Sequence, residues 1–298
     1  MTLRHMRIFI QVYQTQNITK AAALLHMTQP AVTRSIQEIE HHYGVRLFER
    51  INHRLSVTEM GKLLYQQAVH IVDSFDSLEK GLYQGDSFGV LRVGATITIG
   101  NHALPQLLVR FQQQYPHVRV ECMILNAGAL QAALAQNKLD IALIESTIDD
   151  PDLCYQVFSH DQLRLITPPD HPLLQKDRVL LNDLVAYPLL MREEGSAGRT
   201  FLEHVFASRG LPLRPATVSI STHAILKAVH YGLGISLLPH QLVEEDIKNG
   251  NVLTKDIADV DLSRQHMIVW HRNKYLSPML QAFMALCEAA PPEADLGE

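Results

Sequence analysis

Four polar residues near the N-terminus could together recognise the bases of DNA. At helical spacing their side chains would share one face: Gln29, Thr33, Arg34 and Gln37. Amide and hydroxyl groups hydrogen-bond to base edges, and an Arg side chain binds guanine or phosphate through two parallel N–H groups. Thr28 is a suitable N-cap, and Pro30 fits the first turn, where its missing N–H costs nothing. We therefore expect a DNA-reading helix to start at Thr28.

The neighbouring stretches predict how this helix would be held. An amphipathic helix is expected over residues 3–17, and the Ala-rich stretch ITKAAALLH indicates a second, short helix that can cross the first closely. A tight turn then leads into the reading helix, which makes a helix-turn-helix. Two β-prone stretches, RLFERI and RLSVT, predict a wing that would place Arg50, His53 and Arg54 beside the DNA backbone. The alternative is a plain three-helix domain with a solvated polar face.

Residues 58–84 carry one long helical pattern. Apolar residues recur at intervals of three and four: Leu63, Leu64, Ala68, Ile71, Val72, Phe75, Leu78 and Leu82. A lone helix of this length has nothing local against which to bury such a stripe, so we expect it to pair with its copy in a second chain. A two-fold dimer would present two reading helices to a near-palindromic site.

Beyond residue 89 the pattern changes to alternating strands and helices. Strand-like stretches such as VLRVGAT, VRVECMIL and LDIALIES are separated by helical ones, and a second run of the same kind starts near residue 162. This alternation predicts an α/β body with mostly parallel sheets and helices on their faces. Its length suits two lobes, with the last strand and helix returning to the first lobe.

Four strand-to-helix junctions in this body are rich in small polar residues. They are GATITIGN, LNAGAL, EEGSAGRT and SISTHA. Helix N-termini attract anions, and ligands of open α/β sheets lie at the carboxyl ends of the strands. The candidate residues for a small anionic effector are Thr96, Thr98, Asn126, Ser196, Arg199, Ser221 and Thr222. Ser, Thr and Asn are also good N-caps, so any one junction can serve its helix alone, and Arg199 can equally form a surface ion pair.

Composition limits the class of protein. The chain has 298 residues, of which 47% are hydrophobic and 19% charged, and this suits two or three packed domains. Residues 1–60 hold seven Lys and Arg against four Glu, a net charge of +3, whereas the whole chain has −5. Bulk charge therefore favours nucleic acid only at the N-terminus.

Several classes of site are not expected. There is no signal-peptide pattern and no apolar run of about 20 residues, so we expect a cytoplasmic protein without a membrane partner. The three cysteines, Cys122, Cys154 and Cys287, form no CxxC motif and are expected to be inert core thiols, with redox sensing by Cys154 left open. No nucleophile elbow, phosphate loop or metal-ligand spacing occurs, so no catalytic residue, cofactor or metal is expected.

The stretch NITKAAALLHMTQPAVTRSIQEIEHHYGVRLFERINHRLSVTEMG closely resembles the head of LysR-type transcriptional regulators. Matching positions include Thr28–Val32, Glu40, Gly44, Leu47, Phe48, Arg50, Thr58 and Gly61, while Thr33 and Val57 stand where Ser and Leu are common. The resemblance implies an all-α winged helix-turn-helix over residues 1–60 and a linker and dimerisation helix over 61–88. It also implies a periplasmic-binding-protein-like α/β effector domain over 89–298, with lobe I at about 89–161 and 266–298 and lobe II at about 162–265.

By this resemblance the DNA-contact candidates are Gln29, Pro30, Thr33, Arg34, Arg50 and Arg54. The stretch TITIGNHALP further resembles members linked to sulfur or small-anion metabolism.

These observations together predict a transcriptional regulator. Its partners would be promoter DNA, a small anionic effector, a second or further copies of the chain as a dimer or tetramer, and possible contact with RNA polymerase. Two alternatives stay open at this point. One is an enzyme with a DNA-binding head, and the other is an architectural DNA-binding protein.

Overall fold

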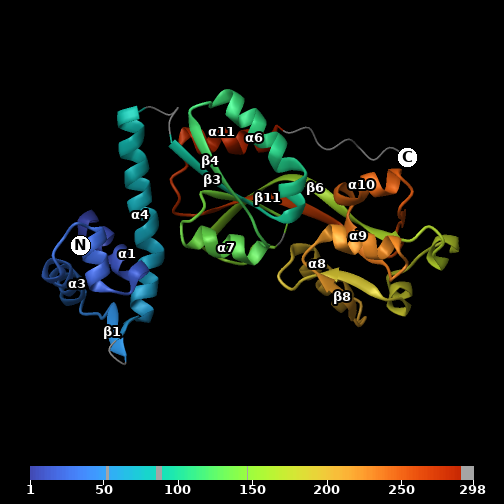
Figure 1. Cartoon of the computed structure of the whole chain (residues 1–298), viewed down its shortest axis with the longest axis horizontal. Coiled ribbons are helices and arrows are strands. Elements are labelled where there is room, and N and C mark those ends of the chain that lie inside the picture. Colours follow the sequence, from blue (N-terminus) through green and yellow to red (C-terminus); the bar gives the residue numbers. More distant parts are fainter. Residues whose placement is uncertain (52–53, 85–88, 146, 290–298) are drawn as a thin grey trace.

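The N-terminal head folds as a winged helix-turn-helix (Figure 1). The computed structural model describes residues 1–51, 54–84, 89–145 and 147–289, so His53 of the expected wing lies outside the described residues. Val32, Ile36 and Ile39 of the reading helix are buried, as its periodicity predicts. The elements of the head are α1 (Leu3–Thr15), α2 (Ile18–Leu24), α3 (Gln29–Tyr43) and the antiparallel pair β1 (Phe48–Ile51) and β2 (Arg54–Val57).

The linker helix α4 (Glu59–Gln84) belongs partly to the head. Tyr65, Ala68 and Val69 join the core of the head, and the ring of Tyr65 stacks on Tyr13 at 3.7 Å between centroids. The expectation that this helix has no local partner is therefore wrong for this part, because α1 lies along it. Among the described side chains of α4, large apolar residues stay exposed at Met60, Leu63, Ile71, Phe75 and Leu78. In the part of the chain that the structure describes, none of the helices is long and apolar enough to cross a bilayer.

Lobe I is built on a sheet with helices on both faces (Figure 1). Strand β3 pairs in parallel with both β4 and β5. Helices α6 and α11 pack on one face around Phe111 and Phe283, and α7 packs on the other around Leu130. The elements are β3 (Gly89–Ala95), α5 (Ile97–Asn101), α6 (Ala103–Gln114), β4 (Val118–Ile124), α7 (Ala127–Ala135), β5 (Ile141–Ile144) and α11 (Pro278–Glu288).

Lobe II contains a second set of strands and helices. Strand β7 pairs in parallel with β8, as predicted, but β9 and β10 pair antiparallel with β6 (Leu153–Thr167), so the expectation of mostly parallel pairing is wrong for this lobe. Phe206 of α8 and Ile235 are fully buried in its core. The elements are η1 (Pro172–Gln175), η2 (Leu181–Ala186), β7 (Leu189–Arg192), α8 (Ala197–Ser208), β8 (Pro215–Ser219), α9 (Thr222–His230), β9 (Ser236–Pro239), α10 (His240–Lys248) and β10 (Leu253–Lys255).

Two long strands, β6 (Leu153–Thr167) and β11 (Ser263–His271), join the lobes. They are antiparallel neighbours in a sheet of order β10-β6-β11-β5-β3-β4, and β9 pairs with the second half of β6. The expected lobe boundaries, 161/162 and 265/266, fall inside these continuous strands. Each strand therefore contributes residues to both lobes, and the sheet continues from one lobe into the other.

A cluster of charges joins α4 to lobe I. Asp73 of α4 lies 3.2 Å from Arg92 Nη2 and 2.5 Å from Lys274 Nζ. The same two cations bind Asp140, Arg92 at 2.6 Å and Lys274 at 2.5 Å. Burial alone would raise the pKa of Asp140, but Lys274 and Arg92 outweigh it and hold that pKa below its ordinary value. An alternating network of two anions and two cations thus fixes the linker helix to the body.

Two histidines stack in the same contact. The rings of His70 of α4 and His271 at the end of β11 are parallel within 8°, with 3.6 Å between centroids, and are 1% and 2% exposed. Burial, with smaller contributions from His271 and Lys274, lowers the pKa of His70 to about 4. Burial likewise lowers the pKa of His271. Both imidazoles are therefore neutral at neutral pH.

The cysteines differ from one another in burial. Cys287 of α11 is buried, and burial raises its pKa to about 12, as an inert core thiol requires. Cys154 is half-buried on β6. Cys122 is exposed, so its expected place in a core is wrong; β4 is the edge strand of the sheet, and the strand order that exposes it is not visible in the local sequence.

Candidate functional site

The outer face of α3 carries the polar residues expected to read bases. Gln29, Arg34 and Gln37 are exposed, and Thr33 is half-buried. Gln29 Nε2 donates to Thr33 Oγ1 at 3.0 Å, and Arg34 Nε donates to Glu38 Oε1 at 2.9 Å. Arg34 has a side chain that is 82% exposed, so it can leave Glu38 at little cost. The face is thus preordered by local bonds and open to a partner.

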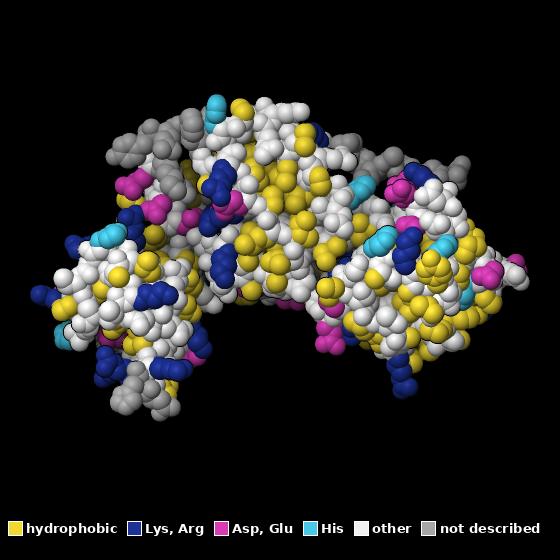
Figure 2. Space-filling view, viewed as in Figure 1, with side chains coloured by type: hydrophobic (Ala, Val, Ile, Leu, Met, Phe, Trp, Pro, Cys, Tyr) yellow, Lys and Arg dark blue, Asp and Glu magenta, His cyan; other side chains and the backbone are white. Residues whose placement is uncertain are grey.

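The start of α3 and the wing complete this surface. Thr28 is the N-cap residue by backbone position but makes no side-chain cap bond, and Thr28 and Pro30 are exposed. Arg50 and Arg54 of the wing are exposed as well. Lys and Arg side chains gather on the head in the space-filling view, as the +3 charge of residues 1–60 predicts (Figure 2).

Glu40 has a structural role that its spacing did not reveal. Its Oε1 accepts hydrogen bonds from the backbone N–H groups of Leu47 at 2.7 Å and Phe48 at 3.2 Å. The carboxylate therefore fixes the start of the wing against the reading helix. In the sequence, Glu40 stands out only as part of the family pattern, because a bond to the backbone seven residues away leaves no periodic signal.

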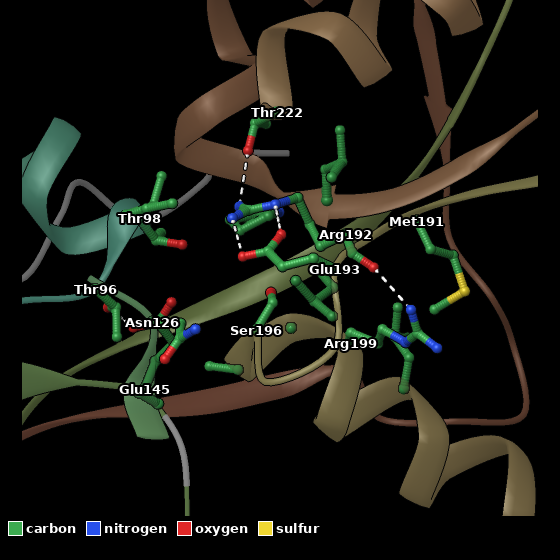
Figure 3. A pocket seen from close by; sticks show the side chains of 18 of the residues that line it. Thr96, Thr98, Asn126, Glu145, Met191, Arg192, Glu193, Ser196, Arg199 and Thr222 are labelled. Carbon is green, nitrogen blue, oxygen red and sulfur yellow. Dashed lines mark hydrogen bonds and ion pairs between the residues drawn. The ribbon is translucent and has the colours of Figure 1, made fainter. Parts of the chain in front are cut away.

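A cavity between the lobes collects most of the residues expected to bind an effector (Figure 3). It measures about 30 Å³, room for one or two waters. All four polar junctions, β3–α5, β4–α7, β7–α8 and β8–α9, contribute residues to its wall. The predicted residues that line it are Thr96, Thr98, Asn126, Ser196, Arg199 and Thr222.

The hydrogen bonds show which of the predicted effector residues cap a helix with their side chains and which keep a polar group that a ligand could bind. Asn126 Oδ1 accepts from Ala129 N at 2.9 Å and caps α7, although its side chain also lines the cavity. Ser221 Oγ accepts from Ala224 N at 3.2 Å, and Ser221 is exposed and absent from the cavity wall, so it serves its helix. Ser196 precedes α8 without capping it through its side chain. Its hydroxyl is therefore available to a ligand.

Arg192 is a cavity residue that sequence analysis missed. It ends β7, and its Nη1 donates to Thr222 Oγ1 at 3.1 Å. Its Nε and Nη2 donate to the two carboxylate oxygens of Glu193 at 2.9 and 3.0 Å. The stretch MREEGSAGRT shows that a cation lies near the junction, but only the parallel pairing of β7 with β8 brings Thr222 beside it.

Arg199, the cation predicted from the sequence, is bound by Glu203 of α8 and by Glu194 just before that helix. Nε donates to Glu203 at 2.8 Å, Nη2 to Glu194 at 3.3 Å and Nη1 to the backbone oxygen of Arg192 at 3.3 Å. In the close-up view it lies beside Met191, across the start of α8 from Thr98 and Asn126 (Figure 3). These contacts favour a structural role for Arg199 in the cavity wall over direct contact with an effector.

The floor of the cavity is a buried charged network. Arg264 of β11 forks onto Asp161 of β6, and Asp161 lies 3.4 Å from His266 Nε2. Burial would raise the pKa of Asp161, but the neighbouring imidazole and guanidinium outweigh it and lower that pKa. Glu145 accepts from Thr96, and Arg264 Nη1 lies 4.0 Å from Glu145 without a hydrogen-bond partner among the described residues. One buried N–H group is thus unsatisfied at the cavity.

The arrangement suits a small oxyanion better than a metal. Hydroxyl groups and guanidinium groups donate hydrogen bonds, whereas a metal needs several carboxylate, imidazole or thiolate ligands at one point. Over the described ranges no three His, Cys, Asp or Glu side chains are grouped in that way.

Comparison with known proteins matches both parts of the chain. The model of the LysR substrate binding domain matches residues 84–291, and that of the bacterial regulatory helix-turn-helix protein of the lysR family matches residues 3–62. The chain is 30% identical over 289 residues to the uncharacterised HTH-type transcriptional regulator YeiE of Escherichia coli (strain K12), covering 97% of this chain and 98% of that protein.

Solved structures show the same architecture. Full-length OxyR of Pseudomonas aeruginosa superposes with a TM-score of 0.73 at 24% identity, over 97% of this chain and 94% of that one, and this likeness concerns the fold. The regulatory domain of CcmR from Synechocystis PCC6803, solved in complex with 2-PG, gives a TM-score of 0.63 at 27% identity over 67% of this chain and 96% of that one.

Proposed function

This chain belongs to the LysR family of transcriptional regulators, and we propose that a small oxyanion held between its lobes controls its action at a promoter. Members of the family are DNA-binding regulators with an effector-binding domain, and the relatives that match this chain are named as regulators and not as enzymes.

The cavity at the lobe interface is the observation that supports an anionic effector. Thr98 and Ser196 contribute hydroxyl groups from the two lobes, and Arg192 and Arg264 contribute guanidinium groups. Charge-assisted hydrogen bonds from such donors are the strongest that a small site can offer to a carboxylate, phosphate or sulfur oxyanion. The CcmR domain, which was solved with 2-PG, has the same fold. An effector bridging both lobes would favour their closure, because it binds the closed form better.

A thermal-shift screen of sulfate, sulfite, phosphate, nitrate and oxalate tests this proposal. A ligand at 100 times its Kd stabilises the protein by about 2.7 kcal/mol. We expect at least one oxyanion to raise the Tm, and Thr98→Ala and Ser196→Ala to reduce that rise. Ser221→Ala is the matched control, since Ser221 caps a helix outside the cavity. If none of these anions stabilised the protein, the proposed effector class would be wrong.

We further propose that α3 reads the major groove of a near-palindromic promoter site as part of a dimer. The exposed stripe of α4, Leu63, Ile71, Phe75 and Leu78, supports pairing with a second copy, and two-fold symmetry would set two copies of α3 on matching half-sites. Contact with RNA polymerase would follow from binding next to a promoter. Phe75→Asp should weaken self-association in sedimentation experiments; an unchanged sedimentation coefficient would contradict the pairing.

Base readout is tested with Arg34→Ala and Gln29→Ala. Losing a bidentate base contact costs about 1–3 kcal/mol of discrimination. We therefore expect both variants to lose preference for the operator over random DNA in a competition binding assay at fixed salt. Arg119→Ala, which removes one exposed positive charge from lobe I, is the control for net charge. Normal operator preference in the Arg34 variant would exclude the assigned groove contact.

A further inference from the structure

Each guanidinium group at the cavity is already paired with a carboxylate of the protein itself. Arg264 is bound by Asp161, Arg199 by Glu203 and Glu194, and Arg192 by Glu193. The described cavity therefore holds no cation that lacks a counter-charge. An incoming anion has to join one of these pairs or replace one of these carboxylates.

The pair of Arg192 and Glu193 differs from the others in its shape. Two parallel N–H groups, Nε and Nη2, donate to the two oxygens of one carboxylate at 2.9 and 3.0 Å. This is the geometry in which an Arg side chain binds a free carboxylate or phosphate. Thr222 holds the remaining end of the guanidinium through Nη1 at 3.1 Å. Figure 3 shows the Glu193 carboxylate directed back onto Arg192, with Thr98 and Asn126 to one side of it and Ser196 below it.

We propose that Glu193 is an internal competitor of the effector: its carboxylate occupies the anion position on Arg192 and has to leave when the effector binds. This inference rests on the proposed function of the cavity as an oxyanion site. It adds a specificity-determining residue and a regulatory step to that function. The measured affinity for the effector then reflects the difference between two binding free energies, that of the effector and that of the Glu193 carboxylate on Arg192.

The hydrogen bonds of Arg192 support displacement rather than addition. Its Nε and Nη2 donate to Glu193 and its Nη1 donates to Thr222, so each nitrogen of the guanidinium already donates and the pair of N–H groups that could bind an oxyanion is occupied. A second negative charge beside the Glu193 carboxylate would also be repelled by it. Moving that carboxylate away frees the two N–H groups that an oxyanion needs.

The surroundings make Glu193 the partner that moves. Its side chain is 20% exposed, compared with 11% for Arg192, so a small rotation places its carboxylate in water and leaves no buried unpaired charge. Gly195, two residues on, has φ +81, a conformation available to glycine that lets the loop turn sharply there. Arg192, in contrast, is retained by Thr222 when Glu193 leaves.

The fork also selects the class of ligand. An anion that replaces Glu193 must present two oxygens about as far apart as those of a carboxylate, as carboxylates, phosphate and sulfate do. A monatomic anion such as chloride meets only one N–H group at a time. Oxyanions should therefore compete with Glu193, and chloride should not.

The test compares Glu193→Gln with Glu194→Gln in the full-length protein. Both changes remove one negative charge from adjacent positions, but Glu194 is 87% exposed and contacts only Arg199 at 3.3 Å. Isothermal titration with sulfate, phosphate and oxalate, and with chloride as the monatomic probe, measures Kd for the two variants and the wild type. We expect about tenfold tighter oxyanion binding by Glu193→Gln, with Glu194→Gln close to the wild type and chloride bound by none.

The other outcomes contradict the inference in distinguishable ways. Equal oxyanion affinity in all three proteins, or an equal gain in both variants, would exclude internal competition while leaving the proposed oxyanion site intact. Tight chloride binding by Glu193→Gln would exclude selection by the fork. Absence of oxyanion binding in all three proteins would overturn this inference together with the proposed function.

Discussion

The stacked histidines between α4 and lobe I predict a loss of stability in mild acid. Burial holds the pKa of His70 at about 4 in the folded protein, whereas an exposed histidine titrates near 6.5. Between these values the unfolded chain takes up a proton that the folded chain does not, so stability is present above pH 6.5 and falls as the pH decreases towards 4. The pKa of His271 is lowered as well, which acts in the same direction.

The size of the effect follows from the two pKa values of His70. Each pKa unit of difference corresponds to 1.36 kcal/mol. At a pH below both pKa values, the loss of stability that comes from His70 is therefore about 3 kcal/mol. At pH 5 roughly 2 kcal/mol of this is already lost, since the unfolded form is almost fully protonated and the folded form is not. The pKa of Asp140 lies below its ordinary value, so this carboxylate in the same contact stays ionised over the window from pH 7.5 to 5.

Trp270 offers a direct optical measurement. It is the one tryptophan of the chain and precedes His271 on β11, so its fluorescence reports on this end of lobe I during urea unfolding. His70→Phe keeps a ring against His271 but cannot take up a proton. We expect the wild type to lose about 2 kcal/mol more than His70→Phe between pH 7.5 and 5.

A matched control is His160→Phe, which makes the same replacement at an exposed position of β6. It should retain the full pH dependence of the wild type. Equal pH dependence in the wild type and His70→Phe would refute the reasoning, because the proton uptake would then arise elsewhere.

Three further changes have expected outcomes. Phe9→Ala removes a fully buried ring from the core of the head and should cost about 3–5 kcal/mol in urea unfolding, with operator binding lost at 37 °C. Gly234→Ala would place a Cβ 2.3 Å from the backbone oxygen of Pro188, so lobe II should be destabilised by roughly 2 kcal/mol or more, seen as a lower urea midpoint. Asp161→Asn leaves the buried Arg264 without its counter-charge and should lower the free energy of unfolding by about 3–5 kcal/mol. The control Asp177→Asn, at an exposed position, should leave that free energy almost unchanged. Equal urea midpoints for Asp161→Asn and Asp177→Asn would contradict the buried pair.

Local patterns in the sequence predicted the elements well and the contacts between them poorly. The capping of α7 by Asn126 and the burial of Val32, Ile36 and Ile39 depend on neighbours three or four residues away, which periodicity reveals. Arg192 and Thr222 are 30 residues apart and meet through strand pairing, so neither residue type nor spacing indicates their bond.

Charge pairing is the second property that local sequence does not show. The place of Arg199 in the first turn of a helix predicts an anion-binding group, but Glu203, one turn later, already binds it. Nothing in the local sequence marks Arg264, since its partner Asp161 is 103 residues away on an antiparallel strand. A cation in a sequence becomes a candidate ligand group only when the carboxylates facing it are known.

Strand β11 connects the effector cavity to the linker helix within nine residues. Arg264 lies near its start at the cavity and His271 at its end against His70, roughly 24 Å apart at the usual rise of a strand. Strand β11 pairs with β5 on one side and with β6 on the other, so lengthwise sliding would break hydrogen bonds on both sides. The pairing with β6 shifts register between His266 and Met267, an irregularity of the kind at which local twist increases. A ligand that changed the twist of β11 at Arg264 would therefore act on His271 and on the contact with the linker helix.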